Sequence, residues 1–135
     1  MTDEKTNLEN AVKKEILIVD DGETNRILLN SLLEYDYDIR EACNGKQAYE
    51  EIEKKMPDLV ITDMEMPDEN DGLNLIKKIK ENDKYKDIKI IAISGSLEKY
   101  ESRLLEYIEA RDMLAKPFGI NDLRDTVKRK IYNSH

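Results

Sequence analysis

The sequence predicts one α/β domain in which helices cover both faces of a parallel sheet. Two observations support this fold class. Five short apolar stretches alternate with five segments whose apolar residues recur at helical spacing. Four of these stretches are continuous apolar runs, which are typical of parallel strands buried on both faces. Strict alternation of strands and helices implies right-handed crossovers, and a chain of 135 residues suits a single core.

The first half of the chain supplies three strands and two helices after a polar start. Residues 1–14 are charged and lack periodicity, so we expect a frayed or loosely helical extension before a domain spanning 15–133. The first helix ends near residue 35, and the second begins at Asn44 and ends at Pro57, which cannot continue a helix. These helices are marked by Ile27, Leu28, Leu32 and Leu33, then by Ala48, Tyr49, Ile52 and Met56. All five predicted strands lie at residues 16–19, 37–42, 59–62, 90–93 and 113–115.

The second half supplies two strands and three further helices. A loop at residues 64–71 precedes the first of these helices, and Asn121 is a plausible N-cap for the last one. Apolar residues again recur on one face of each helix. They are Leu73, Leu75, Ile76 and Ile79, then Leu97, Tyr100, Leu104 and Ile108, and finally Ile120, Leu123, Val127 and Ile131.

Composition and charge exclude several classes of protein. A net charge of −8, with 39% charged residues, disfavours binding to nucleic acids and anionic membranes. No apolar stretch approaches the roughly 18 residues that cross a bilayer. With Cys43 as its one cysteine the chain forms no internal disulfide, which is compatible with the cytoplasmic location that we expect. The only histidine is His135, so Ser-His-Asp and Cys-His catalysis and histidine-ligated zinc are disfavoured.

Polar residues follow four of the predicted strands. Asp20 and Asp21 follow the first, Asp63 the third, Ser94 the fourth and Lys116 the fifth. Because ligands of open α/β sheets bind beyond the carboxyl ends of the strands, these side chains are expected to share one pocket. Three carboxylates favour an oxygen-seeking divalent cation, and Mg²⁺ fits best. A lysine and a hydroxyl suit the oxygens of a phosphoryl group, and Asp63 at the central strand is the expected nucleophile.

Five segments carry a resemblance to a known family: residues 16–21, 59–67, 71–73, 91–95 and 115–118. In these segments the chain resembles the receiver domains of two-component response regulators, over residues 14–132. The resemblance implies a flavodoxin-like (βα)5 sheet with strand order 2-1-3-4-5. It also implies a phosphoacceptor, Asp63, that receives its phosphoryl group from a phosphohistidine.

The resemblance further assigns the remaining site residues. It implies that Asp21, Asp63 and the backbone carbonyl of Glu65 hold Mg²⁺, and that Asp20 acts through water. Ser94 and Lys116 would contact the phosphoryl group. The segment at residues 19–26 is similar to receivers attached to hybrid kinases.

Three features depart from the family pattern. Met113 stands where receivers usually carry an aromatic switch residue. Methionine is expected to fill the strand edge; the alternative is that switching relies on this flexible methionine, or on Tyr107 or Tyr100. The loop at residues 67–72 is one residue longer than usual and acidic; it is expected to be solvated, with tuning of metal affinity or kinase choice as the alternative. Glu65 is expected to repel hydroxide or to pair with Lys116, and so to lengthen the phosphorylated lifetime.

The expected function is a phosphoacceptor switch that is not an enzyme beyond catalysing its own phosphorylation and hydrolysis. Its expected partners are a sensor histidine kinase or histidine phosphotransfer protein, and an unknown downstream protein on the face of the fourth helix, fifth strand and fifth helix. A monomer or a phosphorylation-dependent dimer is expected.

The initial Met favours a complete chain. Two alternatives stay open: a pseudo-receiver that binds partners without phosphorylation, and a receiver excised from a hybrid kinase. An aspartyl phosphatase is disfavoured because no general-acid aspartate stands two residues after Asp63, where the chain has Glu65, and because no cap domain is expected to shape a substrate pocket.

Overall fold

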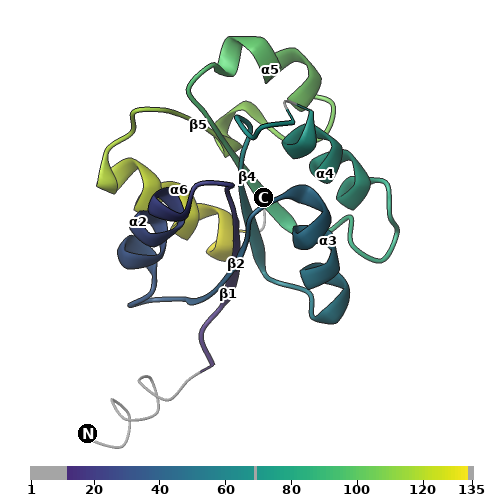
Figure 1. Cartoon of the computed structure of the whole chain (residues 1–135). Helices are drawn as coiled ribbons and strands as arrows, with labels where there is room; N and C mark the ends of the chain where they lie inside the picture. Colours follow the sequence, from purple (N-terminus) through teal and green to yellow (C-terminus); the bar gives the residue numbers. More distant parts are fainter. Residues whose placement is uncertain (1–11, 69, 134–135) are drawn as a thin grey trace, which may run out of the picture.

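The structure is a computed structural model that describes residues 12–68 and 70–133, so most of the expected extension lies outside the described residues. Five parallel strands form one sheet in the order β2-β1-β3-β4-β5, which confirms the predicted order 2-1-3-4-5 (Figure 1). The central strand β3 is buried along its whole length. The strands are β1 (Glu15–Val19), β2 (Asp38–Ala42), β3 (Leu59–Asp63), β4 (Lys89–Ser94) and β5 (Met113–Ala115).

Helices cover both faces of this sheet (Figure 1). On one face α2 and α6 share a hydrophobic cluster with Ile16 and Ile18, and on the other α3, α4 and α5 share a cluster with Leu17 and Val19. This division follows from the alternation of side chains along a strand, which sends neighbouring residues to opposite faces. The helices are α2 (Glu23–Leu33), α3 (Gly45–Lys54), α4 (Asp71–Lys80), α5 (Leu97–Leu104) and α6 (Ile120–Tyr132), and a short 3₁₀ helix η1 (Ala110–Asp112) precedes β5. No helix of the described residues is long and apolar enough to cross a membrane.

Three helix boundaries differ from those that the sequence predicts. Helix α3 ends at Lys54 and excludes Met56, because a residue before proline is disfavoured in helical conformation. Helix α5 ends at Leu104, although Ile108 beyond it still packs into the core.

The predicted N-cap of the last helix is also wrong. Gly119 occupies the N-cap position, and Asn121 lies inside α6. The backbone N–H of Gly119 donates to the carboxylate of Asp122, at 3.4 Å, so an acid in the first turn supplies the capping contact. By contrast, the predicted start of the second helix at Asn44 agrees with the structure: Asn44 is the N-cap of α3, and its side chain accepts a 2.7 Å hydrogen bond from the Gln47 N–H.

Candidate functional site

The sheet register brings the predicted site residues to one edge. The last paired residues of β1 and β3 lie side by side, so Asp20 and Asp63, which come next, are level with each other. Ser94 ends the neighbouring strand β4, and Lys116 follows β5 directly. The backbone N–H of Lys116 donates to the Ser94 carbonyl at 2.8 Å, which ties these two strand ends together. The four polar side chains therefore come from four strands and meet at the carboxyl edge.

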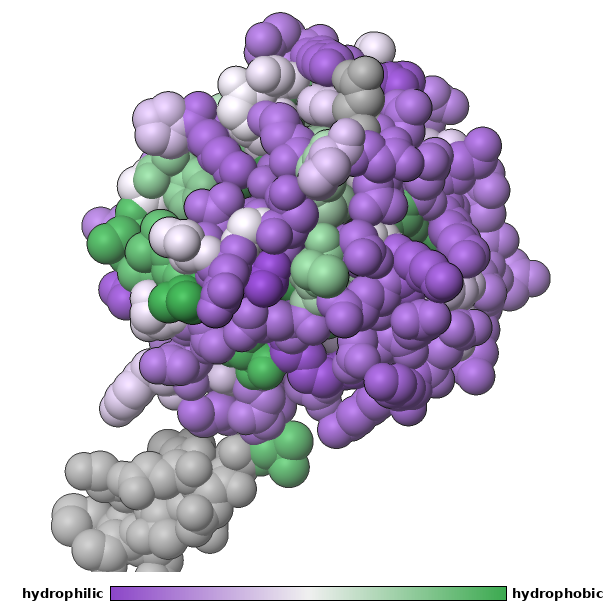
Figure 2. Space-filling view, in the orientation of Figure 1, coloured by the Kyte–Doolittle hydropathy of each residue, from purple (hydrophilic) through white to green (hydrophobic). Residues whose placement is uncertain are grey.

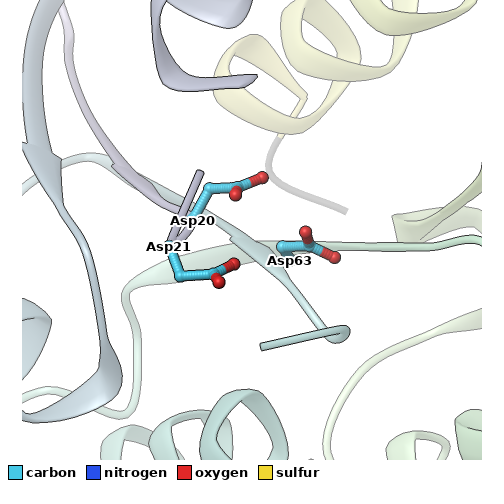
Figure 3. A group of neighbouring side chains, drawn as sticks. All are labelled: Asp20, Asp21 and Asp63. Carbon is cyan, nitrogen blue, oxygen red and sulfur yellow. The ribbon is translucent and has the colours of Figure 1, made fainter. Parts of the chain in front are cut away.

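Three carboxylates gather at this edge (Figure 3). One oxygen from each of Asp20, Asp21 and Asp63 lies within 4.8 Å of the other two. Asp20 and Asp63 are buried and Asp21 is exposed. Two unit charges about 4 Å apart repel by roughly 4 kcal/mol at an effective dielectric constant of about 20. The donor set is all oxygen, so this acidic pocket can bind a hard divalent cation that offsets the repulsion.

The turn after β1 is fixed by a short hydrogen-bond network. Asp20 Oδ1 accepts hydrogen bonds from the Gly22 N–H at 2.8 Å and from Asn25 Nδ2 at 3.4 Å. Arg26 donates from Nη1 to the Asp20 carbonyl at 2.7 Å, while its Nε pairs with Glu41 on β2 at 3.1 Å. Sequence reasoning assigned no role to Arg26. The only feature of the sequence that could have indicated such a role is the position of Arg26, a cation near the start of the helix that follows Asp20 and Asp21.

Asp63 is held by two polar contacts, one to each oxygen of its carboxylate. Lys116 Nζ lies 3.0 Å from Asp63 Oδ2, and the Glu65 N–H donates to Oδ1 at 3.0 Å. Burial nevertheless raises the pKa of Asp63 above its ordinary value, and the negative charge of Asp20 adds to this effect. The Glu65 N–H and Lys116 act in the opposite direction. The site therefore holds a desolvated carboxylate that Lys116 compensates only in part.

Glu65 contacts a different partner from the one expected. Its carboxylate accepts hydrogen bonds from the Ser94 hydroxyl, at 3.0 and 2.8 Å, and from the Gly95 N–H. The Lys116 ammonium instead pairs with Asp63, so the predicted pair between Glu65 and Lys116 is not formed. Gly95 did not stand out in the sequence as a hydrogen-bond donor. The only feature of the sequence that could have indicated this role is that a glycine directly follows Ser94.

Comparison with known proteins identifies the family. A family model described as the response regulator receiver domain matches residues 16–128. The chain belongs to this family. It is 36% identical over 119 residues to sporulation initiation phosphotransferase F of Bacillus subtilis (strain 168), which covers 87% of this chain and 94% of that protein.

Two further similarities extend this finding. The receiver is 35% identical over 127 residues to histidine kinase P4 of Formosa agariphila, which covers 90% of this chain but only 9% of the kinase. Among solved structures, chemotaxis response regulator CheY4 of Vibrio cholerae has a TM-score of 0.76 at 26% identity. That match covers 87% of this chain and 98% of CheY4. The receiver thus resembles both free-standing response regulators and part of a larger kinase.

An apolar groove opens beside the acidic pocket of the receiver. It has a volume of about 480 Å³ and extends from Asp63 along α2 to the loop that precedes α6. Leu28 and Ile120, two of its lining residues, are 57% and 50% exposed. Figure 2 shows hydrophobic side chains gathered over α2 and the start of α6. This surface joins the acidic pocket to an exposed apolar area.

Met113 lies in the core of the receiver. Its side chain belongs to the cluster beneath α3, α4 and α5, and Tyr107 packs against the same cluster from a partly buried position. Tyr100 is almost fully buried. These contacts agree with methionine filling the strand edge. The switch roles considered for Tyr107 and Tyr100 stay predictions.

Proposed function

We propose that this receiver accepts a phosphoryl group on Asp63 from the phosphohistidine of a sensor histidine kinase or a histidine phosphotransfer protein. A carboxylate oxygen of Asp63 forms a bond to phosphorus while the bond from phosphorus to the imidazole nitrogen breaks. The imidazole leaves with the electron pair and takes up a proton. Water later cleaves the acyl phosphate, which releases inorganic phosphate and restores the carboxylate. The observation that carries this proposal is the buried Asp63 carboxylate between the acid pair and Lys116.

The neighbouring side chains support this chemistry. Phosphoryl transfer spreads negative charge over three oxygens, so catalysis consists mainly of positioning and neutralisation. Lys116 already lies against Asp63, and its ammonium can follow the charge onto a phosphoryl oxygen. Ser94 supplies a hydroxyl on the adjacent strand end. We propose that catalysis by the receiver is limited to its own phosphorylation and hydrolysis.

We further propose that the divalent cation of the acidic pocket is Mg²⁺. The fit rests on the donor set, because three carboxylates supply oxygen ligands without histidine or thiolate. Asp21, Asp63 and the Glu65 backbone carbonyl would hold it, with Asp20 acting through water. When bound, it would neutralise charge on the transferring phosphoryl group.

The apolar groove supports a particular mode of donor docking. A donor must bring its phosphohistidine to Asp63, and the groove begins at that residue. Its exposed residues Leu28 and Ile120 would be covered by a partner that approaches over α2. Similarity to part of histidine kinase P4 supports a kinase or phosphotransfer partner.

The output side of the proposal concerns a downstream protein. We propose that it contacts the α5-β5-α6 face of the receiver. The receiver itself would act as a monomer or would form a dimer when it is phosphorylated. A net charge of −8 argues against nucleic acid as the target. A single cysteine supports a cytoplasmic location.

The test is intact mass spectrometry after incubation with acetyl phosphate. Wild type is expected to gain one phosphoryl group in the presence of Mg²⁺, and neither Asp63→Ala nor metal-free wild type should gain it. A correctly folded wild type that gains no group from acetyl phosphate or from a phosphohistidine donor would contradict the proposal. Such a result would favour phosphorylation-independent partner binding.

A further inference from the structure

The carboxylate of Glu65 occupies a cradle of hydrogen-bond donors beside Asp63. The Ser94 hydroxyl lies 2.8 Å from Glu65 Oε2 and 3.0 Å from Oε1, and the Gly95 N–H donates to Oε1. Ser94 is buried, whereas Glu65 is exposed. An exposed acid has therefore folded its carboxylate back onto two donors at the end of β4. Hydrogen bonds to an ionised acceptor are about twice as strong as neutral ones, so these donors bind the Glu65 carboxylate strongly.

The donors in the cradle are fully used. A serine hydroxyl has one proton to donate, and the Ser94 oxygen already accepts a hydrogen bond from the Ser96 N–H at 2.8 Å. Its single proton therefore goes to Glu65. The Gly95 N–H also has only one proton. Neither donor can serve Glu65 and a second anion at full strength at the same time.

The same donors face the place where a phosphoryl group on Asp63 would lie. The Met64 N–H donates to the Ile93 carbonyl at 2.8 Å, which holds the end of β3 against the end of β4. Lys116 contacts Asp63 through its ammonium and Ser94 through its backbone N–H. At this edge Ser94 thus lies between Asp63, which would carry the phosphoryl group, and Lys116, which would contact it. An anion attached to Asp63 and the carboxylate of Glu65 would compete for one cradle.

We propose that Glu65 is an internal occupant of the phosphoryl-binding cradle and that it must leave when Asp63 is phosphorylated. This inference rests on the proposed function of Asp63 as phosphoacceptor. Docked Glu65 satisfies Ser94 and Gly95 in the unphosphorylated receiver and so opposes capture of the phosphoryl group. Its release frees a carboxylate on the β3–α4 loop, which makes that loop a surface that differs between the two states.

Gly95 leaves room for the docked Glu65 carboxylate. A Cβ built at Gly95 would lie 3.2 Å from Glu65 Oε1, closer than ordinary van der Waals contact, and its next neighbour is Lys116 Cβ at 4.0 Å. Gly95→Ala therefore crowds the Glu65 carboxylate while leaving the Ser94 hydroxyl and the residue 95 N–H in place. This variant disturbs the docking by changing the residue that donates the hydrogen bond, whereas a change at Glu65 removes the acceptor.

The first measurement tests the contact without phosphorylation. The amide proton of Gly95 is followed by ¹H–¹⁵N NMR in the metal-free protein, where a bond to a carboxylate moves it strongly downfield. Glu65→Ala is expected to move this resonance upfield, with Glu65→Gln intermediate. Asp68→Asn is the matched control, because it removes a charge from the same loop but keeps the acceptor that Asp68 offers to the Asn70 N–H. An unchanged Gly95 resonance in Glu65→Ala would overturn the inference.

The second measurement tests competition, with beryllium trifluoride and Mg²⁺ as the phosphoryl analogue in calorimetric titrations. Glu65→Ala is expected to bind it about tenfold more tightly than wild type, because two charge-assisted hydrogen bonds no longer need to be broken. Glu65→Gln and Gly95→Ala should show smaller gains, and Asp68→Asn should bind like wild type. If Glu65→Ala equals wild type, Glu65 does not compete and the inference is wrong, although the phosphoacceptor role of Asp63 stands.

The two proposals fail in different ways. If wild type takes up neither beryllium trifluoride nor a phosphoryl group but Glu65→Ala takes up both, Glu65 blocks the cradle and the inference holds in its strongest form. If neither protein takes them up, the phosphoacceptor function fails and the competition fails with it. The Gly95 resonance would then report only a structural contact.

Discussion

Beneath the site, the backbone of α4 approaches the end of β3 so closely that only a glycine fits at one position. Gly72 lies in the first turn of α4, where a Cβ would stand 2.8 Å from the Asp63 carbonyl oxygen and 3.3 Å from Met64 Cα. These are backbone atoms of the strand that carries the phosphoacceptor, so they cannot move aside cheaply. Gly72 thus lets α4 begin directly beneath β3.

Gly72→Ala is expected to lower the free energy of unfolding by about 1–3 kcal/mol, despite the better helix propensity of alanine. Urea denaturation measures the change. Gly119→Ala is the comparison for a glycine without a close backbone contact, because the nearest atom to its Cβ would be Asp122 Oδ2 at 3.5 Å; as an N-cap change it should cost no more than about 1 kcal/mol. Equal stability of Gly72→Ala and wild type would show that α4 can shift away from β3.

The phenol of Tyr37 gives a pH dependence whose sign can be worked out. Burial raises the pKa of Tyr37 above its ordinary value of 10.0, and Tyr132 and Asp36 add to the shift. Because the folded-state pKa is the higher one, the stability linked to the neutral phenol is fully present below the unfolded-state pKa. It is lost as the pH rises through the raised value.

Wild type should therefore lose stability relative to Tyr37→Phe as the pH rises from about 8 to 11, a range that spans the ordinary tyrosine pKa. Denaturation of both proteins across this range measures the difference. Tyr35→Phe is the control for loss of a phenol hydroxyl at the surface, because Tyr35 is 87% exposed. A pH-independent difference between wild type and Tyr37→Phe would contradict the expectation.

The convergence of site residues was predictable from the sequence, but their side-chain partners were not. Parallel strands end at one edge, so Asp20, Asp63 and Ser94 meet wherever the strands are assigned correctly. The choice of Glu65 between Lys116 and Ser94 depends on a side-chain rotamer, which neither periodicity nor spacing encodes. The role of Arg26 was missed for a similar reason, since its contact with the Asp20 carbonyl requires the exact direction of α2.

At the scale of elements, strands were predicted more accurately than helix ends. Continuous apolar runs define strands closely, whereas apolar spacing persists past the end of a helix when the following loop also packs into the core. Ile108 illustrates this, because it is buried but lies four residues beyond α5. Gly119 illustrates a second limit, since the acid that completes its cap lies three residues later, and Asn121 was the more conspicuous candidate.

One buried ion pair joins two elements on the α5-β5-α6 side. Asp112, which ends η1, is 1% exposed, and Lys130 of α6 lies 2.8 Å from its Oδ2. Arg129 approaches Oδ1 at 3.6 Å, and that oxygen accepts no hydrogen bond in the described part of the chain. Helix α6 is thereby tied to the start of β5 through a carboxylate that water scarcely reaches.

Lys130→Met is expected to lower the free energy of unfolding by about 2 kcal/mol, because it leaves the buried Asp112 carboxylate with two longer contacts, Arg129 at 3.6 Å and the Glu109 N–H at 3.4 Å. The figure is below that for a fully buried pair, since the Lys130 side chain is 21% exposed. Lys128→Met, which removes the same charge from an exposed position of α6, should change stability by less than about 0.5 kcal/mol. Chemical denaturation compares the two variants. A similar loss in both would assign the effect to net charge rather than to the buried pair.

For the whole molecule, the distribution of charge links stability to the site. The net charge is −8, and three carboxylates of like charge crowd one edge of a sheet that has an apolar cluster on each face. The fold tolerates this repulsion because many apolar contacts on both faces hold the strand ends in place. Any cation that binds only the folded edge must therefore raise the stability of the entire domain.

Mg²⁺ at about ten times its dissociation constant should stabilise the receiver by roughly 1.4 kcal/mol and raise Tm by several degrees. Asp21→Asn is expected to lose most of this gain, and because Asp21 is exposed the variant leaves the core intact. Calorimetric melting curves at constant ionic strength, with NaCl in place of MgCl₂ as the control, separate site binding from general screening. An equal rise in Tm with either salt, or in wild type and Asp21→Asn alike, would mean that the carboxylates act as a diffuse negative surface. A rise restricted to Mg²⁺ and dependent on Asp21 would instead make the acid cluster a metal site that stabilises the fold from its reactive edge.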